Sequence, residues 1–188
     1  HIGVPLTLLK INEKHEMAII EMGANKFKDI AELCAIASPT HGIITNIGKA
    51  HLEGFGGFEG VLKTKNELYD SISSIEGTIV LNQDDHVLVS NAPKNVALVT
   101  YGTRNANVCG EITGVDPFIS FQFKHETYAS PSIKTHLVGK YNFYNFLSAV
   151  SFGILFDVPY SKIENALLPL QQPSEFIRCS CPCSAKTR

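Results

Sequence analysis

The sequence predicts an α/β fold: a mostly parallel sheet with helices on both faces, joined by a small antiparallel β subdomain. The first hundred or so residues repeat strand, helix and strand at the spacing of βαβ units. The later apolar runs alternate and are separated by Gly, Pro and Asp turns, as in an antiparallel meander. Between residues 41 and 70 a strand, a glycine-rich loop and a helix follow one another. Parallel α/β proteins build ligand sites from that arrangement.

In the first half of the chain, apolar runs that suit buried strands alternate with segments of helical periodicity. Residues 15–21 form an apolar run that ends in an acid, which is typical of a central parallel strand. Residues 29–37 carry apolar side chains at helical spacing, and Pro39 ends that helix. Further expected elements are a loop leading into a short helix or strand over residues 2–11, strands over 42–46, 77–82 and 96–101, a helix from Phe58 onward and a short helix over 84–90.

The second half is expected to hold the antiparallel strands and two helices. The strands are expected over residues 107–112, 119–123 and 133–138. A long helix over residues 142–156 follows. Ser161 and Glu164 have the spacing of a capping box, so the last helix is expected to start there.

The composition describes an ordinary globular chain. Its 188 residues are 44% hydrophobic and 18% charged, enough for one α/β domain with a proper core. The formal net charge of -2 argues against a nucleic-acid partner. No apolar stretch is long enough for a membrane span, and no signal peptide opens the chain, so a cytoplasmic location is expected. The protein is also expected to be a monomer. The first residue is not Met, which suggests a fragment of a longer protein.

One domain is expected over residues 1–168, followed by an irregular tail over residues 169–188. The tail contains Cys179, Cys181 and Cys183 but has no apolar periodicity. Zinc sites generally take paired ligands from two places in the chain, and the sequence offers no second cluster. A metal role for these cysteines is therefore not expected, and a truncation or a shifted reading frame is a hypothesis for their origin.

The glycine-rich loop and the helix after it hold the first candidate site residues. Four glycines within ten residues, from Gly48 to Gly57, let a backbone approach an anion or a metal closely. His51 lies among them, and a loop histidine is otherwise most often polar surface. Lys63 and Lys65 follow on the helix. Because they are two residues apart, they point in roughly opposite directions and only one can face the loop.

Glu21 is expected at the carboxyl end of a strand, shortly before Gly23. A carboxylate in that place can hold Mg2+, a hard cation that prefers oxygen ligands. A solvated acid, or a partner for a helix N-terminus, is an equally good interpretation. The residues alone leave both open.

Asn142 and Asn145 are three residues apart and share a face where the long helix starts. An asparagine amide carries both donors and an acceptor, which suits the edge of adenine. Capping of the helix is the alternative for Asn142, and burial of Asn145 in a mostly apolar helix would be costly without a partner.

Four sequence blocks, in this order, resemble the central domain of the Mur ligases. They are GVPLTLL over residues 3–9, EMGAN over 21–25, AHLEGFG followed by KTKNE over 50–67, and GKYNFYN over 139–145. The last block resembles the family pattern G-x-H-N-x-x-N, with Tyr141 in place of the histidine. The resemblance extends over most of the chain, from about Gly3 to Leu168.

The resemblance implies a site for ATP and Mg2+. It implies that Glu21 and His51 bind Mg2+ and that Lys65, fourteen residues after His51, is carbamylated by CO2 and joins the metal site. A lysine in a partly dry site has a lowered pKa, so some of its amine is free to react. It also implies that one asparagine of the last block contacts the nucleotide base, for which Asn145 is favoured over Asn142.

The implied reaction is ATP-dependent ligation of D-alanyl-D-alanine to UDP-N-acetylmuramoyl-tripeptide through an acyl phosphate, in peptidoglycan precursor synthesis. The string HLEGFG favours this reaction over those of other Mur or folylpolyglutamate-type ligases. The sequence contains no G-x-x-x-x-G-K-[ST], so the phosphate-cradling loop is missing from this chain. A non-catalytic nucleotide-binding domain therefore remains an alternative.

Overall fold

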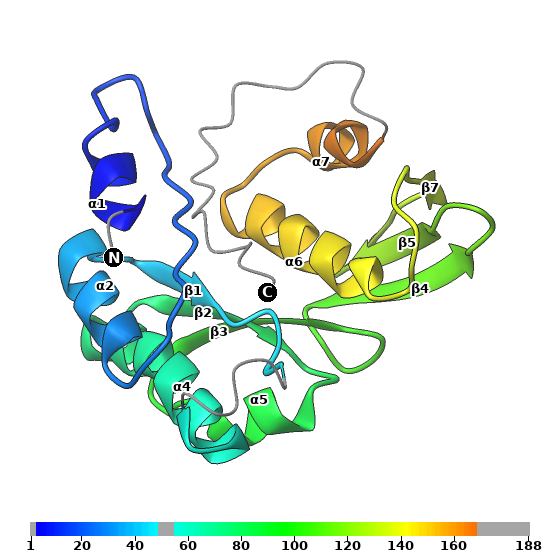
Figure 1. Cartoon of the computed structure of the whole chain (residues 1–188). Coiled ribbons are helices and arrows are strands. Elements are labelled where there is room, and N and C mark those ends of the chain that lie inside the picture. The colour runs from blue at the N-terminus through cyan, green and yellow to red at the C-terminus, as the bar shows by residue number, and fades with distance from the viewer. Residues whose placement is uncertain (1–2, 49–54, 169–188) are drawn as a thin grey trace, which may run out of the picture.

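The computed structural model describes residues 3–48 and 55–168. One seven-stranded sheet runs through this part of the chain in the order β1-β2-β3-β4-β5-β6, with β7 paired to β5. Helices α4 and α5 lie on one face of the sheet, and α6 lies on the other (Figure 1). The predicted α/β class is confirmed. The antiparallel strands continue the parallel sheet rather than forming a separate unit.

Four strands pair in parallel and the remaining three are antiparallel. The parallel strands are β1 (His41–Ile43), β2 (Thr78–Asn82), β3 (Ala97–Gly102) and β4 (Val108–Gly114). The antiparallel strands are β5 (Ser120–His125), β6 (Tyr128–Ala129) and β7 (Ile133–Lys134). The helices are α1 (Gly3–Leu8), α2 (Asp29–Ala37), α4 (Phe58–Ser74), α5 (His86–Asn91), α6 (Asn142–Leu155) and α7 (Tyr160–Leu167).

Strand β2 divides the core into two layers because its successive side chains point to opposite faces of the sheet. Ile79 and Leu81 pack in the cluster under α4 and α5, together with the buried Ile72 of α4. Val80 packs in the cluster under α6. A continuous apolar run in β2 therefore reflects burial on both faces, as expected for a central parallel strand.

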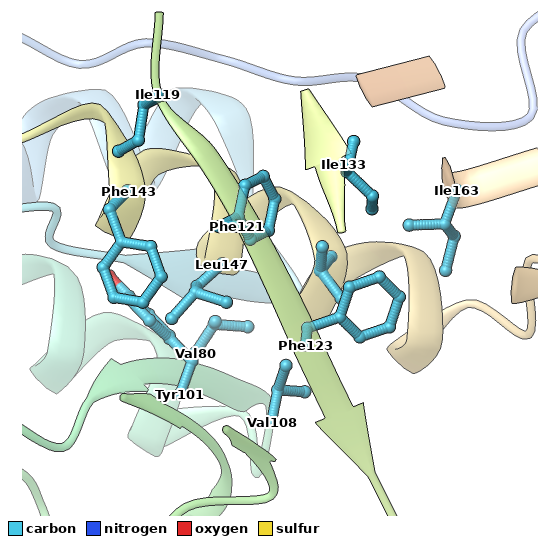
Figure 2. Close-up of a cluster of buried hydrophobic side chains, with 11 residues drawn as sticks. Val80, Tyr101, Val108, Ile119, Phe121, Phe123, Ile133, Phe143, Leu147 and Ile163 are labelled. Atoms are coloured by element: carbon cyan, nitrogen blue, oxygen red, sulfur yellow. The ribbon is translucent and has the colours of Figure 1, made fainter. Parts of the chain in front are cut away.

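The larger core cluster lies between α6 and strands β2 to β5. Figure 2 shows Leu147 at its centre, between the rings of Phe143 and Phe123 and above Val108. Phe121 stacks on Phe146 and meets the ring of Phe143 edge-on. The aromatic rings of the antiparallel strands thus fix the position of α6 over the sheet.

Glycine at position 42 allows α4 to lie directly on β1. A Cβ added there would be 3.0 Å from a side-chain carbon of Ile72 and 3.2 Å from one of Leu68, both on α4. A side chain there would require these two side chains to move by a few tenths of an ångström. Gly42 therefore permits close packing of the Leu68 and Ile72 side chains of α4 on β1.

The prediction of a strand over residues 15–21 is wrong. The segment is not a strand, and only Ile20 in it is even half-buried. Burial alternates along residues 20–24. Ile20, Met22 and Ala24 pack against the small cluster of α1 and α2, whereas Glu21 and Gly23 are exposed. Extended backbone becomes a strand only when a neighbour accepts its hydrogen bonds. The sheet path ends at β1, which pairs with β2 alone among the described residues.

The predicted capping box at the last helix is also wrong. Helix α7 starts at Tyr160, with Pro159 at the N-cap position and no side-chain cap. Glu164 instead accepts a hydrogen bond from the Tyr128 hydroxyl, and the rings of Tyr128 and Tyr160 stack 3.8 Å apart. A contact with the β5–β6 hairpin has replaced the local cap.

No helix in the described part of the chain combines the length and hydrophobicity needed to cross a bilayer.

We expect Leu147→Ala to destabilise the chain by about 2–5 kcal/mol, because the side chain is fully buried and its removal leaves a cavity. Denaturant unfolding followed by circular dichroism measures the change. Leu98→Ala is the matched control, since Leu98 is 39% exposed in β3 and should cost less than about 1 kcal/mol. Equal losses in the two variants would contradict the assigned core.

Candidate functional site at the carboxyl edge of the sheet

Polar side chains gather where the parallel strands end. Parallel strands present their carboxyl ends at one edge of a sheet, which is where α/β proteins bind ligands. Asp84 follows β2, and its Oδ2 atom accepts hydrogen bonds from the backbone N–H of Thr103 at 2.7 Å and from the Tyr144 hydroxyl at 3.2 Å. Thr103 follows β3 and Tyr144 lies in the first turn of α6. One carboxylate therefore connects two strand ends and a helix start.

The close approach of Asp84 to β3 depends on Gly102. A Cβ at that position would lie 2.9 Å from Asp84 Oδ1. The buried Asn82 accepts a hydrogen bond from the Asp84 N–H at 3.1 Å, which fixes the turn after β2. Burial, together with the nearby Asp84 carboxylate, raises the pKa of Tyr144, so its hydroxyl stays a neutral donor.

Lys65 reaches the same edge from α4. Its Nζ atom donates a hydrogen bond to the backbone carbonyl of Asn46 at 2.6 Å, and Asn46 lies shortly after β1. The side chain is half-buried, and burial lowers the pKa of its amine. Desolvation disfavours the ammonium, so a larger share of the amine is neutral than in an exposed lysine.

Lys63 points elsewhere. Its Nζ atom lies 5.0 Å from the centroid of the Phe27 ring, in the turn before α2, and the residue is exposed. The two lysines therefore contact opposite sides of α4, as their spacing predicts. Lys65 is the lysine at the carboxyl edge.

Asn142 and Asn145 lie together on the first turn of α6. The side-chain amide of Asn145 donates to Asn142 Oδ1 at 3.1 Å, and the amide of Asn142 donates to the Val138 carbonyl at 2.9 Å. The N-cap position belongs to Tyr141, so the capping role considered for Asn142 is not observed. Asn145 is exposed, and no burial cost arises. Tyr144, between them in sequence, ties this turn to Asp84 and hence to the carboxyl edge.

Of the other two candidate metal ligands, the structure describes only Glu21. Glu21 is exposed on the unpaired segment before α2. His51 lies outside the described residues. Within residues 3–48 and 55–168, no group of three or more His, Cys, Asp or Glu side chains is arranged to hold a metal ion. The structure thus brings Lys65, Asn142 and Asn145 to one edge of the sheet and leaves the metal set as a prediction.

The structural roles of two carboxylates were not identified from the sequence. One is Asp84, which looks like an ordinary turn acid in the string NQDD. The other is Glu67, whose two side-chain oxygens accept the backbone N–H groups of Lys28 at 2.8 Å and Ala31 at 3.0 Å. Helix α2 has no side-chain cap at its own N-cap residue, which is the only local sign that a distant acceptor is needed.

One known family model matches most of the chain. The family model for the Mur ligase middle domain matches residues 1–153. The chain belongs to the Mur ligase family. It is 30% identical over 168 residues to UDP-N-acetylmuramoyl-tripeptide–D-alanyl-D-alanine ligase of Synechocystis sp. The aligned part is 88% of this chain and 35% of that protein. The same ligase of Haemophilus influenzae is 42% identical over 87 residues, which are 46% of this chain and 19% of that protein.

Solved structures of the same family have the same fold. The crystal structure of MurF from Acinetobacter baumannii superposes with a TM-score of 0.80 at 29% identity and covers 93% of this chain and 38% of that one. MurF from Thermotoga maritima, solved in complex with ADP, gives a TM-score of 0.71 at 24% identity, covering 84% of this chain and 37% of that one, and shows the fold alone. This Mur ligase chain spans well under half the length of these relatives.

We expect the Lys65 amine to titrate below the usual lysine value of 10.5, because its burial disfavours the charged form. The unfolded state then binds more protons between the two pKa values, so stability should rise with pH through that window. NMR of 13C-labelled lysine side chains, assigned with Lys65→Met, measures the titration. A matched control, Lys63→Met, removes an exposed lysine and should leave the Lys65 resonance unchanged; a Lys65 pKa at or above 10.5 would contradict the site geometry.

Proposed function

We propose that this chain is the middle part of an ATP-dependent ligase that joins D-alanyl-D-alanine to UDP-N-acetylmuramoyl-tripeptide in peptidoglycan precursor synthesis. The observation that carries the proposal is the half-buried amine of Lys65 at the carboxyl edge, within a chain of the Mur ligase family. The similarity to UDP-N-acetylmuramoyl-tripeptide–D-alanyl-D-alanine ligases over most of the chain favours this reaction over others in the family. The working enzyme would be a cytoplasmic monomer.

Lys65 would act as a carbamate rather than as an amine. Its neutral nitrogen attacks CO2: an N–C bond forms, one C–O π bond becomes an oxygen anion, and a proton leaves the nitrogen for solvent. The lowered pKa of the amine supports this step because only the neutral form is nucleophilic. The modified side chain carries a negative charge and two oxygen acceptors at the place where Lys65 contacts the end of β1.

The donor types of the three predicted ligands suit Mg2+. Glu21, His51 and the Lys65 carbamate would hold the ion, since two of the three supply the anionic oxygens that magnesium prefers. Bound Mg2+ would reduce the repulsion between the substrate carboxylate and the γ-phosphate of ATP. The exposure of Glu21 and the direction of Lys65 are compatible with this set, and the position of His51 lies outside the described residues.

Asn142 and Asn145 would recognise the adenine. Both amides sit on the first turn of α6, and Asn145 is exposed, so its donors and acceptor can meet a base edge. Asn142 would orient its neighbour through the 3.1 Å hydrogen bond between them. Tyr144 and Asp84 would keep this turn beside the ends of β2 and β3.

These positions indicate which contacts of the complete ligase this chain would supply. In the complete ligase, residues 1–168 would supply the metal, carbamate and adenine contacts. The rest of the longer protein would supply the phosphate-cradling loop, which this sequence lacks, and the contacts to the UDP-sugar and the dipeptide. ATP would phosphorylate the terminal carboxylate of the tripeptide, and the amine of D-alanyl-D-alanine would then displace phosphate. Catalysis would come from positioning and from charge stabilisation around the phosphoryl group.

We expect Lys65→Ala in the complete ligase to reduce kcat by at least about a hundredfold, as loss of a preorganised charge at a reacting phosphate does. Acetate or formate should restore part of the activity, because a small carboxylate can occupy the place of the missing carbamate. Phosphate release that depends on both peptide substrates is the assay. Lys63→Ala should retain activity, and an active Lys65→Ala enzyme would remove Lys65 from the site.

The missing phosphate-loop motif favours a second candidate, a non-catalytic nucleotide-binding domain. We expect the 188-residue chain alone to bind Mg-ATP with a Kd in the millimolar range or weaker, since it would hold only part of an ATP site. Isothermal titration calorimetry measures this. Binding at low micromolar Kd would favour the independent module over a part of a ligase site.

A further inference from the structure

Glu67 connects two regions that lie far apart in the sequence. Its carboxylate accepts the N–H of Lys28 at 2.8 Å and the N–H of Ala31 at 3.0 Å, so both of its oxygens are used. Lys28 is the N-cap residue of α2, has a left-handed φ of 70° and provides no side-chain cap. A carboxylate at a helix N-terminus is stabilised by the free N–H groups and by the helix dipole. Glu67 of α4 therefore caps α2 from another helix.

Glu67 and Lys65 contact opposite sides of α4. Two residues apart on an α-helix, their side chains leave the axis about 200° from each other. Glu67 is bound to the start of α2, whereas Lys65 is bound to the carbonyl of Asn46 at the end of β1. The helix is thus held on both sides.

The turn before α2 is a firm attachment point for this contact. Asp29 is almost completely buried, and its Oδ2 atom accepts the N–H groups of Asn25 at 2.9 Å and Lys26 at 3.1 Å. The buried Ile30 and Leu33 hold the first turns of α2 in the core. Glu67 therefore anchors α4 to a rigid element rather than to a loose loop.

We propose that Glu67 is a positioning residue for Lys65: its hydrogen bonds to the start of α2 set the rotation of α4 and so direct Lys65 to the carboxyl end of β1. The same contact ties α4 to the segment that carries Glu21. The inference deepens the proposed function, because it assigns a residue that orients the carbamate-forming lysine. Its geometric part depends only on contacts within this chain.

The test uses Glu67→Gln, which keeps the shape of the side chain. One amide oxygen can accept one N–H, but the amide nitrogen then faces the other N–H as a second donor. The control is Asp70→Asn, an identical change of an exposed acid on the same helix. NMR on the 188-residue chain measures the NOE between the Lys65 ε-methylene and Asn46, and the hydrogen exchange of the Lys28 and Ala31 amides.

In Glu67→Gln we expect the Lys65–Asn46 NOE to fall by more than half, and the Lys28 and Ala31 amides to exchange about tenfold faster or more, as loss of a charged hydrogen bond predicts. Asp70→Asn should leave both unchanged. In the complete ligase, Glu67→Gln should lower kcat with little effect on the KM for ATP. If Glu67→Gln does not fold, Glu67→Asp, which keeps the charge but cannot reach both N–H groups, takes its place.

An unchanged Lys65–Asn46 NOE in a folded Glu67 variant would overturn the proposal and leave Glu67 as a helix cap alone. That outcome is separate from a failure of the proposed function. If Lys65→Ala remains fully active, the ligase role of Lys65 is lost, but the NOE still decides whether Glu67 positions it.

Discussion

The parallel pairing of β1, β2 and β3 is the constraint on which the rest of the structure depends. It brings the residues that follow each strand to one edge, so Asn46, Asp84 and Thr103 meet there although they come from separate parts of the chain. Each parallel pair also requires a crossover segment on a face of the sheet. Helix α4 is one such crossover, between β1 and β2, which explains why Lys65 can reach the end of β1.

Two carboxylates connect elements that the strand pairing does not itself join. Asp84 joins the ends of β2 and β3 to the first turn of α6, and Glu67 joins α4 to the start of α2. Each accepts two hydrogen bonds, and a bond to a charged acceptor is stronger than one between neutral groups. Both acids look ordinary in the sequence, yet each connects elements that lie far apart in the chain.

The division of α6 into a buried and a polar side serves the same edge. Phe143, Leu147 and Val150 pack in the larger core, where the aromatic rings of β5 hold the helix against the sheet (Figure 2). Asn142 and Asn145 lie on the same first turn but away from that core. The antiparallel strands thus contribute to the candidate site indirectly, because they form the apolar surface on which α6 is placed.

Local pattern in the sequence determined the fold class, both ends of α2 at Asp29 and Ala37, the start of α4 at Phe58, and the shared face of Asn142 and Asn145. These features follow from periodicity and turn chemistry within a few residues, which a single sequence displays. Only the tertiary structure decided that residues 15–21 form no strand, that Glu164 binds Tyr128 rather than capping α7, and that Asp84 and Glu67 connect distant elements. The physical reason is that a strand, a helix cap and a carboxylate contact each need a hydrogen-bonding partner. In this protein, packing between residues far apart in the chain decides whether that partner is present.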